Sequence, residues 1–444
     1  MPCCRTQILP GLKQIIKEPF MGKIKEVLKK TPLREAWWKI KGVPPIKQVR
    51  DYLGDIHEDK LYYEWIPDIY KKAAIAPVDE KKVILVENHP KNLSNTFQEL
   101  YKDLIADGSY KVHIHHLGKG YIHREEHEKN VAKLVKDLGT ARYVFQSEAN
   151  EAISALTLRP ETKVIQLWHA CGAFKKFGRS TMDALFGQDR THADRHPFYK
   201  NYDLVTVSSP EIVWAYAEAM GIDESDGIIR PMGVSRTDVF FNQEYLDTAA
   251  ERVYSVVPQA RDKKIILFAP TFRGKVAIAT TPDYETFNLR QLKEALGDDV
   301  IVLIKNHPHI KDYHTPKIPE DLKGTFAVDV SKKLSIEDLM IAADICITDY
   351  SSLIFEYSLL NKPLVFYAYD LDDYDDWRGF YYNYDELTPG PVCRDMNELI
   401  STLTDPEKLY DQQKMAAFRQ KFMSACDGHS TERIEQYAFG RSLR

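Results

Sequence analysis

Three side chains suited to phosphate or acid–base chemistry follow apolar runs, at the points where strands would end. They are His169 after residues 164–168, Arg273 after 265–268 and His307 after 300–304. A histidine can take a proton from a hydroxyl near pH 7, and cations can neutralise a phosphate. A structural role is the ordinary alternative for any one histidine. Three such residues at corresponding strand ends favour a shared site, because open α/β sheets bind ligands there.

A second candidate site is the Thr-Asp-Tyr-Ser-Ser sequence at residues 348–352. Ser351 and Ser352 stand where a helix over 353–360 would begin, so their hydroxyls and the free backbone N–H groups could bind an anion. Glu356 lies one turn later on the same face, where a carboxylate could accept hydrogen bonds from ribose hydroxyls. The alternative is an ordinary helix cap.

Metal chemistry has little support in the sequence. The histidines lack the spacing of zinc ligands, and no cysteine pair accompanies them. An Asp-x-Asp pattern in the acidic loop 370–376 could hold Mg²⁺ on a nucleotide, but a solvated loop is the simpler interpretation. We therefore expect no metal site and no cofactor, with Mg²⁺ as an open alternative.

The elements that must position these residues alternate between short apolar strands and helices. Strands are expected at 83–86, 112–115, 143–145, 164–168 and 204–207, and then at 265–268, 300–304, 345–347 and 364–367. This alternation is typical of βαβ units and parallel sheets. Because the strands form two such series, we predict an α/β fold of two Rossmann-like domains facing a cleft, at residues 76–255 and 256–444. Terminal helices are expected over 406–443, as a lid or crossover.

Residues 1–50 differ in charge from the rest. They carry twelve Lys/Arg and three Asp/Glu, which gives +9 against −14 for the remainder. Apolar residues recur on one helical face, and Trp37 and Trp38 follow. The pattern predicts a basic amphipathic helical segment over 1–75 that binds an anionic membrane surface. Packing of these helices on the protein body is the alternative.

The composition excludes several classes of protein. A chain of 444 residues with 44% hydrophobic residues is not wholly disordered. Its net charge of −5 argues against a dedicated nucleic-acid binder, so we expect no nucleic-acid partner. The six cysteines are too scattered for a disulfide framework. No apolar run is long enough to span a membrane, and no secretory signal is recognised.

Taken together, the motifs resemble the CDP-glycerol glycerophosphotransferases, which are primases and polymerases of teichoic acid. The matching motifs stand in family order and are Trp168-His169, the turn 231–238, Ala-Pro-Thr-Phe-Arg at 269–273, Asn-His-Pro at 306–308, Asp-Tyr-Ser-Ser at 349–352, Asn-Lys-Pro at 361–363 and the stretch 369–391. The resemblance implies a GT-B fold. It also implies transfer of glycerol phosphate from CDP-glycerol to a lipid-linked polyprenyl-diphosphate acceptor, with release of CMP, at the cytoplasmic face of the membrane by a peripheral enzyme.

The resemblance also implies roles for single residues. His169 would be the general base, and Arg273 and His307 would be catalytic groups on the donor pyrophosphate. The substrate-binding residues would be Thr348, Asp349, Ser351, Ser352, Glu356, Lys305 and Arg378. Two departures are notable: Ala-Cys-Gly follows His169 where Gly-Thr-Pro is common, which bears on the acceptor, and Glu356 stands where an aspartate is frequent.

Three alternatives remain at this point. The donor could be CDP-ribitol, or the chain could be a GT-B glycosyltransferase or epimerase acting on a nucleotide sugar. A membrane-docked binding protein without catalysis is the third. The block 349–352 and the Trp168-His169 pair favour the phosphotransferase. Primases and polymerases share these motifs.

The basic segment generates a first prediction. Deletion of residues 1–50 should release the protein from anionic vesicles, because each Lys or Arg near such a surface contributes about 1 kcal/mol. Vesicle co-sedimentation of both proteins measures this, with zwitterionic vesicles as the control. Unchanged binding would place the membrane contact elsewhere.

Overall fold

A computed structural model describes residues 54, 56–182, 190–273, 280–307, 310, 315–372, 374 and 379–444. The chain divides into two compact units, Met1–Trp65 and Ile66–Arg444. The described part of the first ends in the π-helix η2 (Leu61–Trp65), on which Tyr63 and Trp65 are exposed. The basic segment 1–50 lies outside the described residues. Among the described helices, none is both long and apolar enough to cross a bilayer.

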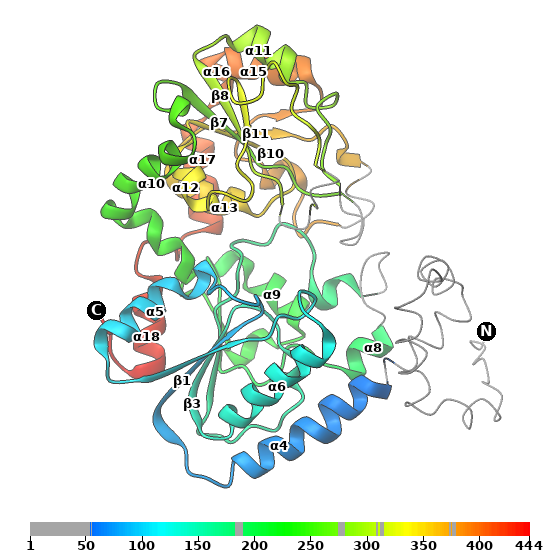
Figure 1. Cartoon of the computed structure of the whole chain (residues 1–444), viewed down its shortest axis with the longest axis vertical. Helices are drawn as coiled ribbons and strands as arrows, with labels where there is room; N and C mark the ends of the chain where they lie inside the picture. The colour runs from blue at the N-terminus through cyan, green and yellow to red at the C-terminus, as the bar shows by residue number, and fades with distance from the viewer. Residues whose placement is uncertain are drawn as a thin grey trace, which may run out of the picture. The chain divides into compact units, whose positions relative to one another are not determined.

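The first half of the second unit is a six-stranded parallel sheet in the order β2-β1-β3-β4-β5-β6. Its neighbouring strands β1 and β3 are seen side by side in Figure 1. Its strands are β1 (Asp79–Glu87), β2 (Lys111–His116), β3 (Ala141–Gln146), β4 (Lys163–Gln166), β5 (Leu204–Thr206) and β6 (Ile229–Arg230). The main helices are α4 (Ile66–Ala73), α5 (Asn95–Asp107), α6 (Arg124–Leu138), α7 (Glu151–Ser154), α8 (Arg190–Arg195) and α9 (Val213–Met220). Successive apolar residues of β1 are buried, as expected for a strand covered on both faces.

The second half repeats this plan in the order β12-β11-β10-β7-β8-β9, again with parallel pairing throughout. Its strands are β7 (Lys264–Phe268), β8 (Val300–Ile304), β9 (Ala327–Asp329), β10 (Ile345–Thr348), β11 (Leu364–Tyr367) and β12 (Val392–Cys393). Its helices are α10 (Gln243–Val256), α11 (Leu289–Leu296), α12 (Ile336–Ala342), α13 (Leu353–Tyr357), α15 (Met396–Thr404), α16 (Pro406–Leu409), α17 (Gln412–Phe422) and α18 (Ser430–Phe439). The expected α/β fold with two parallel sheets is confirmed.

The sequence prediction differs from the structure at the sheet edges and at one strand end. Strands β6, β9 and β12 were not predicted, because two or three residues carry no periodic pattern of their own. The strand expected at 164–168 ends at Gln166. Helix α4, which falls within the expected segment 1–75, belongs to the second unit.

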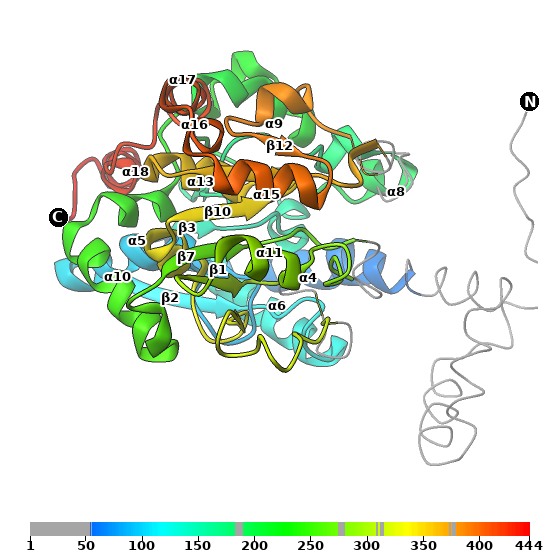
Figure 2. The same ribbon diagram turned by 90° about the horizontal axis from the view of Figure 1, so that it is seen from above.

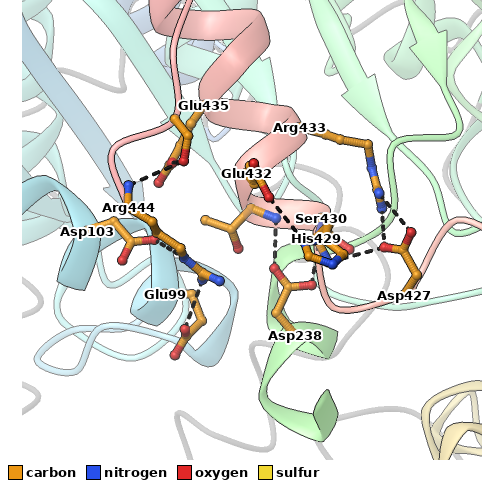
Figure 3. Close-up of polar contacts among 12 residues, drawn as sticks. Glu99, Asp103, Asp238, Asp427, His429, Ser430, Glu432, Arg433, Glu435 and Arg444 are labelled. Carbon is orange, nitrogen blue, oxygen red and sulfur yellow. Dashed lines mark hydrogen bonds and ion pairs between the residues drawn. The ribbon is translucent and has the colours of Figure 1, made fainter. Parts of the chain in front are cut away.

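The C-terminal helices return to the first half of the unit. Figure 1 shows α17 beside the second half and α18 beside α5 of the first half, and Figure 2 shows α18 next to the C-terminus. Ile434 and Ala438 of α18 pack into the hydrophobic core of the first sheet. The Asp238 carboxylate accepts the N–H groups of Ser430 (3.1 Å) and Thr431 (2.8 Å) at the start of α18 (Figure 3). An acid at this end stabilises the helix, so the expected crossover has a defined anchor.

A buried carboxyl group, Glu435, lies on the same helix. It accepts the N–H of Leu443 at 2.8 Å, and the neighbouring Asp103 pairs with Arg444 at 2.8 Å (Figure 3). Burial, with a further contribution from Asp103, raises the pKa of Glu435 from its ordinary 4.5 to about 7. The folded protein therefore retains a proton here that the unfolded chain releases.

This proton makes stability depend on pH. A carboxyl group whose pKa is raised by folding stabilises fully below its unfolded pKa of 4.5, and the contribution is lost as pH rises through about 7. We expect Glu435→Gln, which stays uncharged, to gain stability relative to wild type at pH 8 but little at pH 4.5. Thermal unfolding across this range measures it, with the exposed Glu218→Gln on α9 as control. A difference in stability between Glu435→Gln and wild type that does not vary with pH would contradict the raised pKa of Glu435.

Candidate active site

His169 is turned out of the first sheet by a strained residue. Trp168, two residues beyond the end of β4, has a left-handed φ of 58°, which costs a bulky side chain on the order of 1–3 kcal/mol. Its N–H donates to the Gln166 side chain at 3.0 Å, and its buried ring stacks on His169 with centroids 4.8 Å apart. Side-chain packing therefore fixes the turn that places His169 in a cavity.

The imidazole of His169 has a defined tautomer. Its Nδ1 lies 3.1 Å from the carbonyl oxygen of Ser147. A carbonyl oxygen can only accept, so Nδ1 carries a proton, and in the neutral imidazole the lone pair is therefore on Nε2. A neutral Nε2 held in this way is suited to take a proton from a substrate hydroxyl.

The cavity has a volume of about 600 Å³ and is lined by both halves of the second unit. Residues from the first half include Asn95, Trp168, His169, the loop 170–175, Tyr216 and Arg236. Those from the second half include residues 269–272, Lys305, Asn306, His307, residues 335–337, Ser351, Ser352, Leu353 and Glu356. Of the expected site residues, His169, Lys305, His307, Ser351, Ser352 and Glu356 are therefore brought to one cavity.

The loop after His169 is held by the opposite half. Gly172 has a left-handed φ of 63°, and an added Cβ would lie 2.2 Å from the ring of the buried Phe355. Farther along, the N–H of Lys176 donates to the Gly379 carbonyl at 3.2 Å, and the N–H of Tyr381 donates to the Phe174 carbonyl at 3.2 Å. The position of the loop beside the histidine thus depends on residues of the second sheet.

Arg236, for which the sequence analysis proposed no role, joins the two halves at the cavity wall. One terminal nitrogen donates to the carbonyl oxygen of His169 at 2.7 Å, and the other donates to Glu337 at 2.7 Å. Its Nε lies 3.7 Å from Glu356. Burial raises the pKa of Glu356 although Arg236 opposes this rise. Arg236 stands in the turn 231–238 quoted for the family resemblance, a signal that could have marked it, whereas Glu337 has no sequence signal.

The Thr-Asp-Tyr-Ser-Ser block divides into lining and supporting residues. Ser351 Oγ accepts the Leu353 N–H at 3.3 Å, whereas Ser352 makes no side-chain cap. Thr348 and Asp349 do not line the cavity. Thr348 donates to the Ala269 carbonyl at 2.7 Å, and Asp349 accepts the Thr271 N–H at 2.8 Å. Both therefore connect β10 to the loop after β7.

Arg273 also lies behind the cavity wall. Its guanidinium pairs with Asp349 at 2.9 Å and with Asp370 at 2.6 and 2.8 Å, and Tyr350 donates to the same Asp370 at 2.9 Å. Burial alone would lower the pKa of Arg273, but the two carboxylates raise it above its usual value. Its charge is balanced within the protein, so this structure offers Arg273 as a support for the loop rather than as a cavity cation.

The remaining expected residues differ in what they offer. The Lys305 ammonium donates to the carbonyls of Ser331 (2.7 Å) and Leu334 (2.6 Å), and burial lowers its pKa. His307 packs its ring 4.9 Å from that of Phe272. Arg378 lies outside the described residues. Within the described ranges no three His, Cys, Asp or Glu side chains gather as metal ligands would.

Residues 69–440 match the family described as CDP-glycerol:poly(glycerophosphate) glycerophosphotransferase. The chain belongs to this family. The resemblance expected from the motifs is thereby confirmed. A teichoic acid ribitol-phosphate primase of Bacillus spizizenii W23 is 35% identical over 369 residues, 82% of this chain and 92% of that protein. A teichoic acid glycerol-phosphate primase of Bacillus subtilis 168 is 33% identical over 318 residues, 71% of this chain and 77% of that one.

Solved structures show the same fold. The wall teichoic acid polymerase TagF aligns with a TM-score of 0.69 at 24% identity, over 89% of this chain and 97% of that chain. The expected GT-B-type arrangement is confirmed on this basis. Membership places the chain among the transferases of teichoic acid synthesis. Both glycerol-phosphate and ribitol-phosphate enzymes are among its relatives.

The contact of Gly172 with Phe355 generates a prediction. Gly172→Ala should lose about 1–2 kcal/mol from the left-handed backbone and a further 1–3 kcal/mol, roughly, from overpacking. Gly227→Ala is the matched control, because Gly227 has the same φ of 63° with nothing within 4 Å of an added Cβ. Thermal unfolding compares the two. Equal losses of stability in the two variants would show that the close contact of the loop with Phe355 does not contribute to stability.

Proposed function

We propose that this protein transfers a polyol phosphate from a CDP-linked polyol to a hydroxyl of a membrane-linked acceptor and releases CMP. The observation that carries the proposal is His169, with Nε2 free to accept, in a cavity shared with Ser351, Ser352 and Glu356. Family membership supports this substrate class. The relatives favour CDP-ribitol as the first donor to test, beside the CDP-glycerol that the sequence motifs suggest.

The proposed chemistry follows from the groups in the cavity. The acceptor hydroxyl attacks the phosphorus that bears the polyol, its proton passes to Nε2 of His169, and the bond to CMP breaks. Charge grows on the leaving phosphate, which the Ser351 and Ser352 region and His307 would stabilise. Glu356 would accept hydrogen bonds from the ribose of the nucleotide.

The proposal extends to the setting of the reaction. A lipid-linked polyprenyl diphosphate would carry the acceptor hydroxyl, and the basic segment 1–50 would hold the enzyme peripherally on an anionic membrane surface at its cytoplasmic face. The strong positive charge of that segment supports this, since it contrasts with a negative remainder.

CMP release tests the function. Purified protein is given CDP-glycerol, CDP-ribitol or a UDP-sugar, with a lipid-linked acceptor that is either unprimed or primed with a polyol phosphate. We expect CMP from one or both CDP-polyols, and product length separates primase from polymerase. Release of UDP alone would leave a GT-B glycosyltransferase instead.

Replacement of the proposed base tests the mechanism. His169→Ala should lower kcat by about 10²–10⁴-fold, the usual contribution of a general base, and leave CDP binding largely intact. His116→Ala is the control, since His116 also holds a backbone carbonyl through Nδ1, at 3.0 Å, and does not line the cavity. Full activity of the His169 variant would remove His169 from the mechanism.

A further inference from the structure

Two buried carboxylates among the residues that line the cavity each have one oxygen without a hydrogen-bond partner in the described part of the chain. Glu337 is 2% exposed and Glu356 is 3% exposed. One oxygen of each carboxylate, Oε2, has no hydrogen-bond partner among the described residues, and neither does Nε of Arg236. All three side chains line the same cavity.

Such unpaired groups are rare inside folded proteins, because an unpaired buried polar atom costs on the order of 1–3 kcal/mol. The Oε1 oxygen of Glu337 is already bound by Arg236 at 2.7 Å. The ion pair therefore accounts for one oxygen of Glu337 and leaves the other without a partner among the described residues, on a residue that lines the cavity. Two free acceptors and one donor on one wall indicate that a ligand completes the set.

The chemistry of the wall selects the kind of ligand. A phosphate is disfavoured there, because two carboxylates would repel it. A hydroxyl can donate to a carboxylate and accept from an N–H at the same time. A chain of adjacent hydroxyls matches two acceptors flanking one donor, which describes a sugar or a polyol.

The position of Glu337 separates it from the expected ribose ligand Glu356. The two terminal nitrogens of Arg236 bind the His169 carbonyl and Glu337, each at 2.7 Å, so one guanidinium group separates Glu337 from the backbone of His169. Hydroxyls bound at Glu337 would therefore lie toward the reacting end of the cavity.

We propose that Glu337, held by Arg236, binds the hydroxyls of the polyol chain at the reaction centre and contributes to the choice between polyols. This rests on the proposed function and deepens it. The donor and the terminal unit of the acceptor present the same hydroxyls, and the two arms of the experiment below distinguish them. Arg236 acts as a positioning residue in this arrangement.

The decisive variant is Glu337→Gln, which keeps an oxygen for Arg236 and removes the charge that binds hydroxyls. Without acceptor, we expect unchanged affinity for CDP but about 10–100-fold weaker binding of the preferred CDP-polyol if the donor occupies the subsite. If the acceptor occupies it, the donor affinities stay unchanged and the KM for primed acceptor rises by a similar factor. Calorimetry and steady-state kinetics measure the two arms, and either selective loss supports the proposal.

The ratio of kcat/KM for CDP-ribitol to that for CDP-glycerol is the readout that a purely structural role would not move. Glu251→Gln is the matched control, because it removes a carboxylate from an exposed arginine pair with Arg261, at 2.7 Å, outside the cavity. Glu356→Gln should differ from Glu337→Gln by weakening CDP itself. If the Gln variant does not fold, Glu337→Asp is the second variant. It keeps the charge but moves the carboxylate oxygens back by one methylene, and the same selective loss is expected.

Two outcomes would overturn the subsite: equal loss for CDP and CDP-polyol, or no loss in either arm with an unchanged polyol ratio. Failure of the proposed function is distinguishable, because it would appear as no CMP release by wild-type protein from any CDP-polyol. The donor-binding arm needs no turnover and stands independently of that result.

Discussion

The ion pairs and hydrogen bond of a largely buried guanidinium, that of Arg236, are the interactions on which the arrangement of the cavity depends. A cation removed from water needs partners, and this one takes them from three places: the backbone of His169, α12 through Glu337, and α13 through Glu356. His169 belongs to the half built on the first sheet, whereas Glu337 and Glu356 belong to the half built on the second sheet. The same charge therefore holds the histidine and brings the two halves together.

The loop that carries the histidine is fixed by this contact and by packing. Trp168 adopts a left-handed backbone because its ring is buried against His169, Phe177 and Tyr216. Gly172 lets the loop approach Phe355. Such strain persists only where the surroundings over-determine it. The base and the expected nucleotide-binding wall are thus parts of one packed unit and not independent loops.

Charges that look alike in the sequence have different roles in the structure. Arg273 and Arg236 both follow strands of their sheets, yet Arg273 is paired with Asp349 and Asp370 behind the wall, while Arg236 reaches the cavity. Lys305 lines the cavity, but its ammonium is bound by two carbonyls. A cation's availability to a substrate depends on which acceptors surround it, and these come from distant parts of the chain.

The sequence by itself determined the α/β class, the two series of strands and the family, because apolar periodicity and local motifs are properties of neighbouring residues. It placed His169 at a strand end, Ser351 and Ser352 at the start of a helix and Glu356 one turn into that helix, and the structure brings all four to one cavity. The edge strands β6, β9 and β12, the supporting place of Arg273 and the pairing of Arg236 with Glu337 were decided only by tertiary structure. The edge strands depend on pairing across a sheet, and the arginine contacts join groups about 70 to 100 residues apart. No local sequence pattern shows which distant group will form these hydrogen bonds.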